Sequence, residues 1–176
     1  MYKIYRNVFT QDNLVEIVHQ FNTKSQNQIQ DDDVFNRNKL SVSGDQFKGP
    51  YVNNLREIVL DANTIFNLDI FDPITFEKWN LSTYEQNGFC ADNNDIVKLQ
   101  DVWQRKLTVI IEITRRCDGA NLEMTIPDVL GESKDLIDLL PGDAVVFPSY
   151  VNHSVSKITN GTRQSLTGWV TGPPLK

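Results

Sequence analysis

The sequence has few of the residues from which common catalytic and metal sites are built. Its 176 residues include only two histidines and two cysteines, Cys90 and Cys117, which lie far apart and form no CxxC pair. This spacing excludes a zinc knuckle, and so few cysteines fit a reducing compartment. The motifs GxSxG, GxGxxG and HExxH and the P-loop are also absent. Their absence argues against the usual hydrolase, dinucleotide, zinc-protease and nucleotide-phosphate sites.

Long apolar runs and an excess of positive charge are missing too. No stretch of about 18 apolar residues occurs, and charges interrupt the opening MYKIYRNVF, so we expect neither a membrane span nor a secretory signal. The formal charge of -6 argues against nucleic acid as a partner, because such binding draws its affinity from lysine and arginine. We therefore expect a cytoplasmic protein with no membrane or nucleic-acid partner.

The first part of the chain predicts helices joined by a polar segment. Residues 2–9 alternate apolar and polar side chains and predict a short strand. Residues 11–22 and 51–67 carry apolar side chains at helical spacing, so each predicts an amphipathic helix. Between them, residues 22–48 are rich in Asn, Gln, Asp and Ser. That composition predicts a long solvated loop, or alternatively a lid or substrate-recognition loop.

The rest of the sequence predicts short strands separated by Gly, Pro, Asn and Asp. They cover residues 76–84, a segment through 93–95, 107–114, 120–126, 133–139, 143–147 and a final hairpin within 141–172. Helices followed by seven or eight strands predict an α+β protein with a double-layered β-roll or sandwich. We expect one domain over 1–176, with 1–70 as helical support and polar loop and 71–173 as the β-roll core. The run LTVIIEI, residues 107–113, predicts the most buried strand.

The final hairpin contains His153 and, ten residues later, Arg163, with the turn sequence Asn160-Gly161 between them. A two-residue loop would put His153 and Arg163 on opposite faces of the hairpin. A loop one residue longer, with a bulge, would put His153, Arg163 and Ser165 on one face. Both loops suit an Asn-Gly turn, so these residues alone leave the choice open.

An ordered set of residues carries a family resemblance. In chain order the set is Tyr84, Asn93 to Asp95, Arg105 to Thr108, Pro141 to Asp143, Phe147 to Ser149, His153, Arg163 and Trp169. It resembles the 2-oxoglutarate and Fe(II)-dependent dioxygenases, specifically their small prolyl-4-hydroxylase-like branch. In that family a tyrosine precedes a His-x-Asp pair, and an Arg-Lys-Leu-Ser/Thr strand, a Pro-Gly-Asp turn, a Phe-Pro-Ser segment, a distal histidine and a basic residue follow. The resemblance is detailed over residues 75–172.

The resemblance implies a double-stranded β-helix, or jelly-roll and cupin-like core, with the N-terminal helices packed on one sheet. It implies that Asp95 and His153 bind Fe(II). It also implies that Arg163 and Ser165 receive the distal carboxylate of 2-oxoglutarate, with a hydrogen bond from Tyr84. Ascorbate is a further candidate cofactor. This arrangement requires the longer hairpin loop, because His153, Arg163 and Ser165 must then share a face.

One position departs from the family pattern. Asn93 stands where the family has the first histidine of His-x-Asp, and a neutral amide oxygen is a weak ligand for Fe(II). Three interpretations stay open. Asn93 binds weakly or leaves its place to water, or the metal has been lost, or Cys90 and Asp92 form the pair instead.

The expected function follows from the resemblance. It implies an oxygenase that hydroxylates an unactivated C–H bond, such as that of a peptidyl proline, while 2-oxoglutarate is decarboxylated to succinate. The partners would be this small-molecule co-substrate and a peptide or protein substrate. The alternative is a catalytically inactive binding protein that keeps the fold and has lost the metal site through Asn93.

Overall fold

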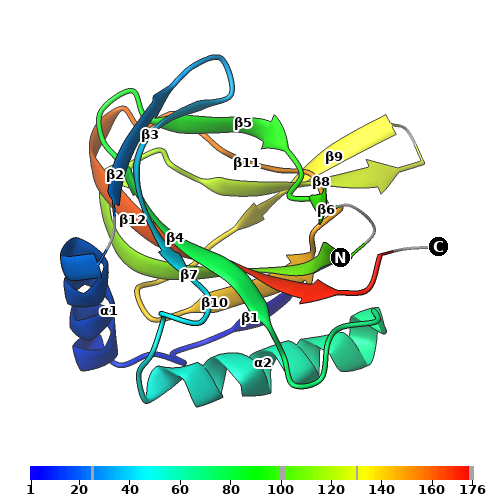
Figure 1. The fold of residues 1–176 in the computed structure, drawn as a ribbon. Helices are drawn as coiled ribbons and strands as arrows, with labels where there is room; N and C mark the ends of the chain where they lie inside the picture. Colours follow the sequence, from blue (N-terminus) through cyan, green and yellow to red (C-terminus); the bar gives the residue numbers. More distant parts are fainter. Residues whose placement is uncertain (25, 100–101, 130, 175–176) are drawn as a thin grey trace.

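The computed structural model describes residues 1–24, 26–99, 102–129 and 131–174. In this part of the chain, twelve strands form one antiparallel sheet that curls into an open roll, and two helices lie on its outside (Figure 1). The predicted α+β class and double-stranded β-helix core are confirmed. Neither of these helices is long and apolar enough to cross a membrane.

In chain order, the strands and helices are β1 (Lys3–Tyr5), α1 (Gln11–Lys24), β2 (Gln26–Asp31), β3 (Phe35–Ser43), α2 (Tyr51–Phe66), β4 (Phe76–Tyr84), β5 (Phe89–Asn93), β6 (Lys98–Leu99), β7 (Trp103–Asp118), β8 (Leu122–Asp128), β9 (Gly131–Ile137), β10 (Ala144–Pro148), β11 (His153–Val155) and β12 (Asn160–Gly172).

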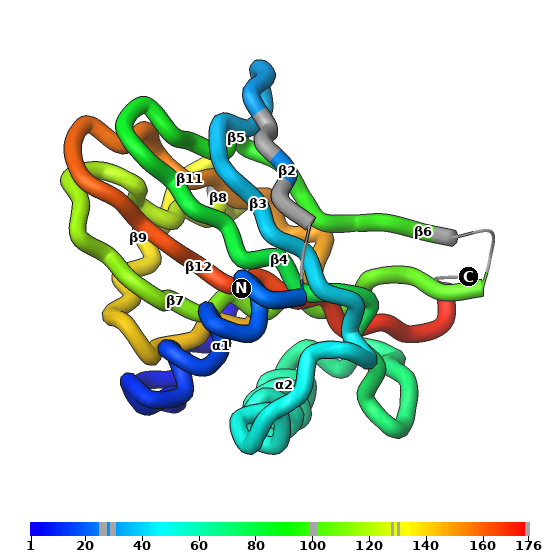
Figure 2. The backbone as a smooth tube through the Cα atoms, turned by 60° about the vertical axis from the view of Figure 1, so that its left-hand side comes forward, coloured from blue at the N-terminus to red at the C-terminus, as the bar shows by residue number. Residues whose placement is uncertain are grey.

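The sheet folds over into two layers. One layer has the order β1-β10-β7-β12-β4, and the other has the order β5-β11-β8-β9. Strand β3 connects them, because residues 38–43 pair with β4 while residues 35–36 pair with β5. Figure 2 shows β3 and β5 rising from the larger layer, with both helices on that layer's far side. Side chains that point inward from both layers meet in the interior of the roll.

The two faces of the larger layer have different roles. On β7, Val109 and Ile111 belong to the core shared with the helices, which includes Ile17 of α1 and Leu55 of α2. Ile110, between them, belongs to the core inside the roll. This is the two-residue alternation of a strand covered on both faces. The predicted helices are confirmed, and all residues of 107–113 are buried as predicted.

The predicted polar loop over residues 22–48 is wrong. This segment forms β2 and β3, which pair with each other, and β3 enters the main sheet. Asn, Gln and Asp have low strand propensity, but pairing with β4 and β5 supplies the hydrogen bonds that override it. The roll therefore begins before residue 71. The first strand is also shorter than predicted, since β1 ends at Tyr5.

The predicted final hairpin is also wrong. Strand β11 pairs with β5 and β8, whereas β12 pairs with β4 and β7. Neither of the two predicted loops exists, because Asn160 and Gly161 are already paired with β7. Residues 156–159 cross from one layer to the other, and Ser156 and Ile158 donate backbone hydrogen bonds to Asn121 and Gly88. The crossing places β11 and β12 on opposite sides of the roll.

The other predicted strands are present with shifted ends. β4 has the predicted bounds, 76–84. β7 is longer than predicted, from Trp103 to Asp118. The segment through 93–95 becomes the end of β5, and Asp95 lies just beyond it.

The turn Pro141-Gly142-Asp143 fixes the start of the chain to the roll. Gly142 has φ +94°, a left-handed conformation that favours glycine. Asp143 accepts hydrogen bonds from the backbone N–H groups of Asn7 and Leu140, at 2.8 and 3.0 Å, and from Arg6 at 2.7 Å. Burial acts to raise the pKa of Asp143, but these hydrogen bonds outweigh it and hold the pKa below its ordinary value.

Replacing Asp143 with asparagine should lower the free energy of unfolding by about 1.5–3 kcal/mol at pH 7, because a buried, charged acceptor is lost. The pKa of Asp143 is lower in the folded protein than in the unfolded chain. Its contribution is therefore present above the unfolded pKa of about 3.9 and lost as the pH falls through the folded pKa. Urea denaturation should thus show a difference between variant and wild type that shrinks below about pH 4. Asp138→Asn, at a carboxylate 76% exposed, is the control. Equal losses at pH 7 and in acid would contradict this prediction.

Candidate functional site

A small cavity of about 50 Å³ lies inside the roll. Its walls are the inward-facing side chains of alternate residues on several strands, and they include Phe35, Arg37, Asn80, Ser82, Tyr84, Cys90, Asn93, Asp95, Ile110, Leu122, His153, Val155, Arg163, Ser165, Thr167 and Trp169. A larger hollow of about 500 Å³ lies outside the roll, beside α2 and β4. The inner cavity is the candidate site, because it combines charged groups with burial.

Asp95 and His153 lie close together in the lining of this cavity. Nε2 of His153 lies 3.6 Å from Oδ2 of Asp95, close to the separation of about 3 Å expected for neighbouring ligands with metal bonds of about 2.1 Å. Nδ1 of His153 lies 3.2 Å from the carbonyl oxygen of Val151, a contact that leaves Nε2 free as a ligand. Thr108 donates to Oδ2 of Asp95 at 3.0 Å. The pair thus holds Nε2 of His153 and a carboxylate oxygen of Asp95 close together, each side chain oriented by a further contact.

Asn93 lies beside this pair but is held by its own strand. It is the cross-strand partner of His153, and its amide nitrogen donates to the carbonyl oxygen of Ala91 at 2.7 Å and to Sγ of Cys90 at 3.1 Å. Only its neutral amide oxygen remains as a ligand atom. In the described part of the chain, no three His, Cys, Asp or Glu side chains group so that they could hold a metal.

The interpretation with Cys90 and Asp92 as the pair finds no support in the geometry. Asp92 is exposed, and its carboxylate accepts a hydrogen bond from Thr125 at 2.9 Å. Cys90 faces the cavity, but burial raises the pKa of its thiol, which disfavours the thiolate that binds metal.

Arg163 is buried at the cavity wall and is paired with Glu112, which is not among the predicted site residues. Its Nε and Nη2 bond to the two carboxylate oxygens of Glu112, at 2.9 Å and 2.7 Å. Both side chains are almost fully buried, at 1% and 0% exposure. Glu112 is the one charged residue in the apolar run LTVIIEI, and such a residue signals a buried partner. We expected Arg163 to receive a ligand carboxylate. Its Nε and Nη2, the fork of the guanidinium, are instead occupied by the carboxylate of Glu112.

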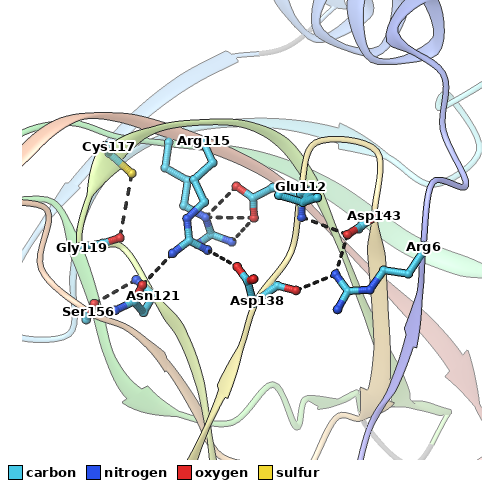
Figure 3. Close-up of polar contacts among 11 residues, drawn as sticks. Arg6, Glu112, Arg115, Cys117, Gly119, Asn121, Asp138, Asp143 and Ser156 are labelled. Atoms are coloured by element: carbon cyan, nitrogen blue, oxygen red, sulfur yellow. Dashed lines mark hydrogen bonds and ion pairs between the residues drawn. The ribbon is translucent and has the colours of Figure 1, made fainter.

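The backbone around Glu112 is anchored to the Pro-Gly-Asp turn. The N–H of Glu112 donates to the carbonyl of Asp143 at 3.0 Å, and Asp143 in turn binds Arg6. Figure 3 shows these contacts, together with Arg115 between Asp138 and Asn121. The position of the Glu112 carboxylate is therefore fixed by both its backbone and its ion pair.

Tyr84 and Arg37 lie beside Arg163, since Tyr84 is the cross-strand partner of Arg163. Nη1 of Arg37 donates to the hydroxyl of Tyr84 at 2.8 Å, which leaves the hydroxyl proton of Tyr84 available to a ligand. Burial raises the pKa of Tyr84, although Arg37 and Arg163 act in the opposite direction, so the phenol stays protonated. Arg37 lies on β3, within the segment predicted as a loop, and so it is not among the predicted site residues.

Four buried polar atoms in this cavity wall have no hydrogen-bond partner. They are Nε of Arg37, Oγ of Ser82, Nη1 of Arg163 and Nε1 of Trp169, and they are all the buried side-chain N and O atoms without a partner in the described residues. Such atoms are rare in folded proteins, and each calls for an explanation. All four can donate a hydrogen bond. Their gathering around one cavity fits a small ligand rich in acceptor oxygens, such as a carboxylic acid.

The structure thus brings every predicted site residue to one cavity. Asp95, His153, Tyr84, Arg163 and Ser165 all line it, and Asn93 lies beside Asp95 and His153. Their roles in binding metal and 2-oxoglutarate stay predictions. We expected these residues to share one face of a hairpin. Instead, they come from two layers of the sheet, which enclose the cavity between them.

Comparisons with known proteins place the fold. No family model matches the sequence, and a search of curated proteins found no match. Solved structures do match. A prolyl-4-hydroxylase from Pseudomonas putida superposes with a TM-score of 0.75 at 18% identity, covering 98% of this chain and 93% of its own. The viral collagen prolyl hydroxylase of Paramecium bursaria Chlorella virus-1, solved with 2-oxoglutarate, gives 0.69 at 11% identity, covering 97% and 96%.

A third structure has a peptide bound. A prolyl hydroxylase from Trichoplax adhaerens, in complex with a fragment of hypoxia-inducible factor, gives a TM-score of 0.67 at 16% identity, covering 96% of this chain and 82% of its own. The chain therefore shares the fold of 2-oxoglutarate and Fe(II) oxygenases, including prolyl hydroxylases. At these identities the likeness concerns the fold.

Proposed function

We propose that the chain is a 2-oxoglutarate and Fe(II)-dependent oxygenase that hydroxylates an unactivated C–H bond of a peptide or protein substrate. The observation that carries the proposal is that one cavity is lined both by the close pair Asp95 and His153 and by four donors without a partner. A metal-binding pair and a receptor for an acid are the two parts that such a reaction requires. Ascorbate is proposed as an auxiliary reductant.

The residues present fit a metal with two protein ligands. His153 would offer Nε2, since its Nδ1 is directed at the carbonyl of Val151, and Asp95 would offer a carboxylate oriented by Thr108. Asn93 would contribute an amide oxygen or leave its position to water. With iron bound, O2 would be the oxidant, taking two electrons from 2-oxoglutarate as it becomes succinate and CO2 and two from the C–H bond that is hydroxylated.

The other residues would bind and orient the acid. Nη1 of Arg163, Ser82 and Trp169 offer donors along the wall, and Tyr84 offers its hydroxyl proton. Ser165 lies on the same inward face of β12 and is proposed to share the distal carboxylate with Arg163. Charge-assisted hydrogen bonds of this kind are about twice as strong as neutral ones. Together they would hold the co-substrate so that its 2-oxo acid end faces Asp95 and His153.

The test compares the two histidines of the chain. His153→Ala should weaken Mn(II) or Fe(II) binding on the order of 100-fold, because one of two ligand side chains is lost, and should abolish succinate formation from 2-oxoglutarate. His19→Ala is the matched control, since His19 is exposed on α1, and should leave both properties unchanged. Calorimetric titration of the metal and a succinate assay give the readouts. Equal metal affinity in His153→Ala and wild type would refute the proposed site.

A second candidate is a non-catalytic domain that binds a small acid. It is favoured by the neutral amide at position 93, which offers no strong third ligand for iron. Under this candidate, wild type would bind 2-oxoglutarate yet bind no iron and form no succinate. The same two measurements therefore separate the candidates.

A further inference from the structure

Arg37 is a positive charge at the cavity with no carboxylate in contact with it. Arg163, by contrast, is paired with Glu112 at 2.7 Å. The carboxylate of Asp95, farther away, still acts to raise the pKa of Arg37. Among the described residues, no carboxylate oxygen lies within 4.0 Å of the Arg37 side chain. Its contacts are the hydroxyl of Tyr84 and the rings of Phe35 and Tyr84, whose centroids lie 4.6 and 5.8 Å from Cζ.

Arg37 as a whole is half-buried, but part of its guanidinium is removed from water without an acceptor. Nε of Arg37 is shielded from solvent and has no acceptor. A guanidinium has five N–H donors and no acceptor, and removing it from water is unfavourable unless an anion compensates. The aromatic contacts compensate only in part, because cation–π contacts contribute less than an ion pair with full hydrogen bonding.

Arg37 and Arg163 both line the inner cavity. Cζ of Arg37 and Cζ of Arg163 lie 5.8 and 5.9 Å from the centre of the Tyr84 ring. Arg163 has only Nη1 left to offer, since Glu112 takes its other donors. Arg37 keeps Nε free and bonds through Nη1 to a neutral hydroxyl that a ligand oxygen can replace.

We propose that Arg37, on β3, is the main anchor for a carboxylate of the small acid bound in the roll, with Arg163 assisting through Nη1 alone. This inference rests on the proposed function in taking the ligand as an aliphatic dicarboxylate such as 2-oxoglutarate. It changes which residue holds the acid. The anchor comes from the N-terminal polar segment, and the arginine ten residues after His153 is largely neutralised within the protein.

The experiment titrates the protein with glutarate and with 2-oxoglutarate, once in EDTA and once with Mn(II), by calorimetry and by thermal shift. Arg37→Met should weaken glutarate binding on the order of 10- to 100-fold, the effect of losing one or two charge-assisted hydrogen bonds. Without ligand, its melting temperature should be no lower than that of wild type, because an uncompensated charge has been removed. Arg37→Lys keeps the charge but not the planar fork, and should show an intermediate loss.

The matched control is Arg56→Met, at an exposed arginine of α2 beside the outer hollow, which should bind as wild type does. If Arg37→Met binds glutarate like wild type, or melts lower with unchanged affinity, Arg37 is structural and the inference is wrong. If wild type binds neither acid in either buffer, the inference is also wrong. Metal affinity decides the proposed function separately, since it depends on Asp95 and His153 and not on Arg37.

Discussion

Replacing Glu112 with glutamine is expected to lower the free energy of unfolding by about 3–5 kcal/mol, because it leaves the buried guanidinium of Arg163 without its counter-charge. Glu112 and Arg163 are 0% and 1% exposed and joined by three contacts of 2.7 to 3.1 Å. Glutamine has nearly the same shape, so the loss reports charge and not packing. Urea denaturation at constant pH and ionic strength measures it.

The control for this prediction is a surface pair. Glu123→Gln removes a carboxylate that lies 3.2 Å from Lys134, where the side chains are 25% and 49% exposed. Its cost should stay below about 1 kcal/mol. A double variant, Glu112→Gln with Arg163→Met, should recover much of the loss, since it removes both charges. Similar costs for Glu112→Gln and Glu123→Gln would show that the buried pair contributes little to stability.

The same variant should respond more strongly to acids. With the carboxylate of Glu112 gone, Nε and Nη2 of Arg163 become available, and a ligand carboxylate can replace it. Added glutarate should therefore raise the melting temperature of Glu112→Gln by more than that of wild type. An equal rise in both proteins would indicate that ligands do not reach the fork of Arg163.

Replacing Asn93 with histidine should raise the affinity for Mn(II) or Fe(II) on the order of 100-fold or more, since imidazole replaces a neutral amide as the third ligand. Position 93 is the cross-strand partner of His153, and both line the cavity with Asp95. The imidazole would therefore lie beside the existing pair. Succinate formation from 2-oxoglutarate should rise with the affinity.

The control for this second prediction is the neighbouring residue. Asn94 is exposed and contacts Asn152 at 3.3 Å, so Asn94→His adds an imidazole that points away from the cavity. It should leave metal affinity unchanged. If Asn93→His binds metal no better than Asn94→His, position 93 does not face the metal pair in solution.

Local sequence patterns predict the structure correctly where strand or helix periodicity decides the outcome. Arg163 and Ser165 are two residues apart on β12, so they face the same side whatever β12 pairs with. The run 107–113 is a buried strand as predicted, because apolar content reports burial directly. The helix over 51–67 is predicted correctly because its apolar stripe repeats at helical spacing.

Local sequence patterns fail where the structure of a segment depends on its pairing with distant strands. The Asn160-Gly161 pair has the local signature of a hairpin turn, but these residues pair with β7 and the chain crosses between layers before them. Residues 35–43 have the composition of a polar loop because their β-propensity is low, although β4 and β5 provide edges for them to join. Arg37 and the pairing of Glu112 with Arg163 could not be predicted for the same reason, since only the assembled roll reveals what lies opposite them.

The position of β12 in the sheet has a consequence for how the protein folds. This strand lies between β7 and β4, so the last strand of the chain completes the middle of the larger layer. Until residues 160–172 arrive, β4 and β7 each present an open edge, a state prone to pairing with other chains. Pairing these strands also brings together segments that lie far apart in the sequence. The entropy lost in closing such long loops comes before the stabilising contacts form, which favours slow folding. The inner cavity also depends on this strand, since Arg163, Ser165 and Trp169 of β12 belong to its lining.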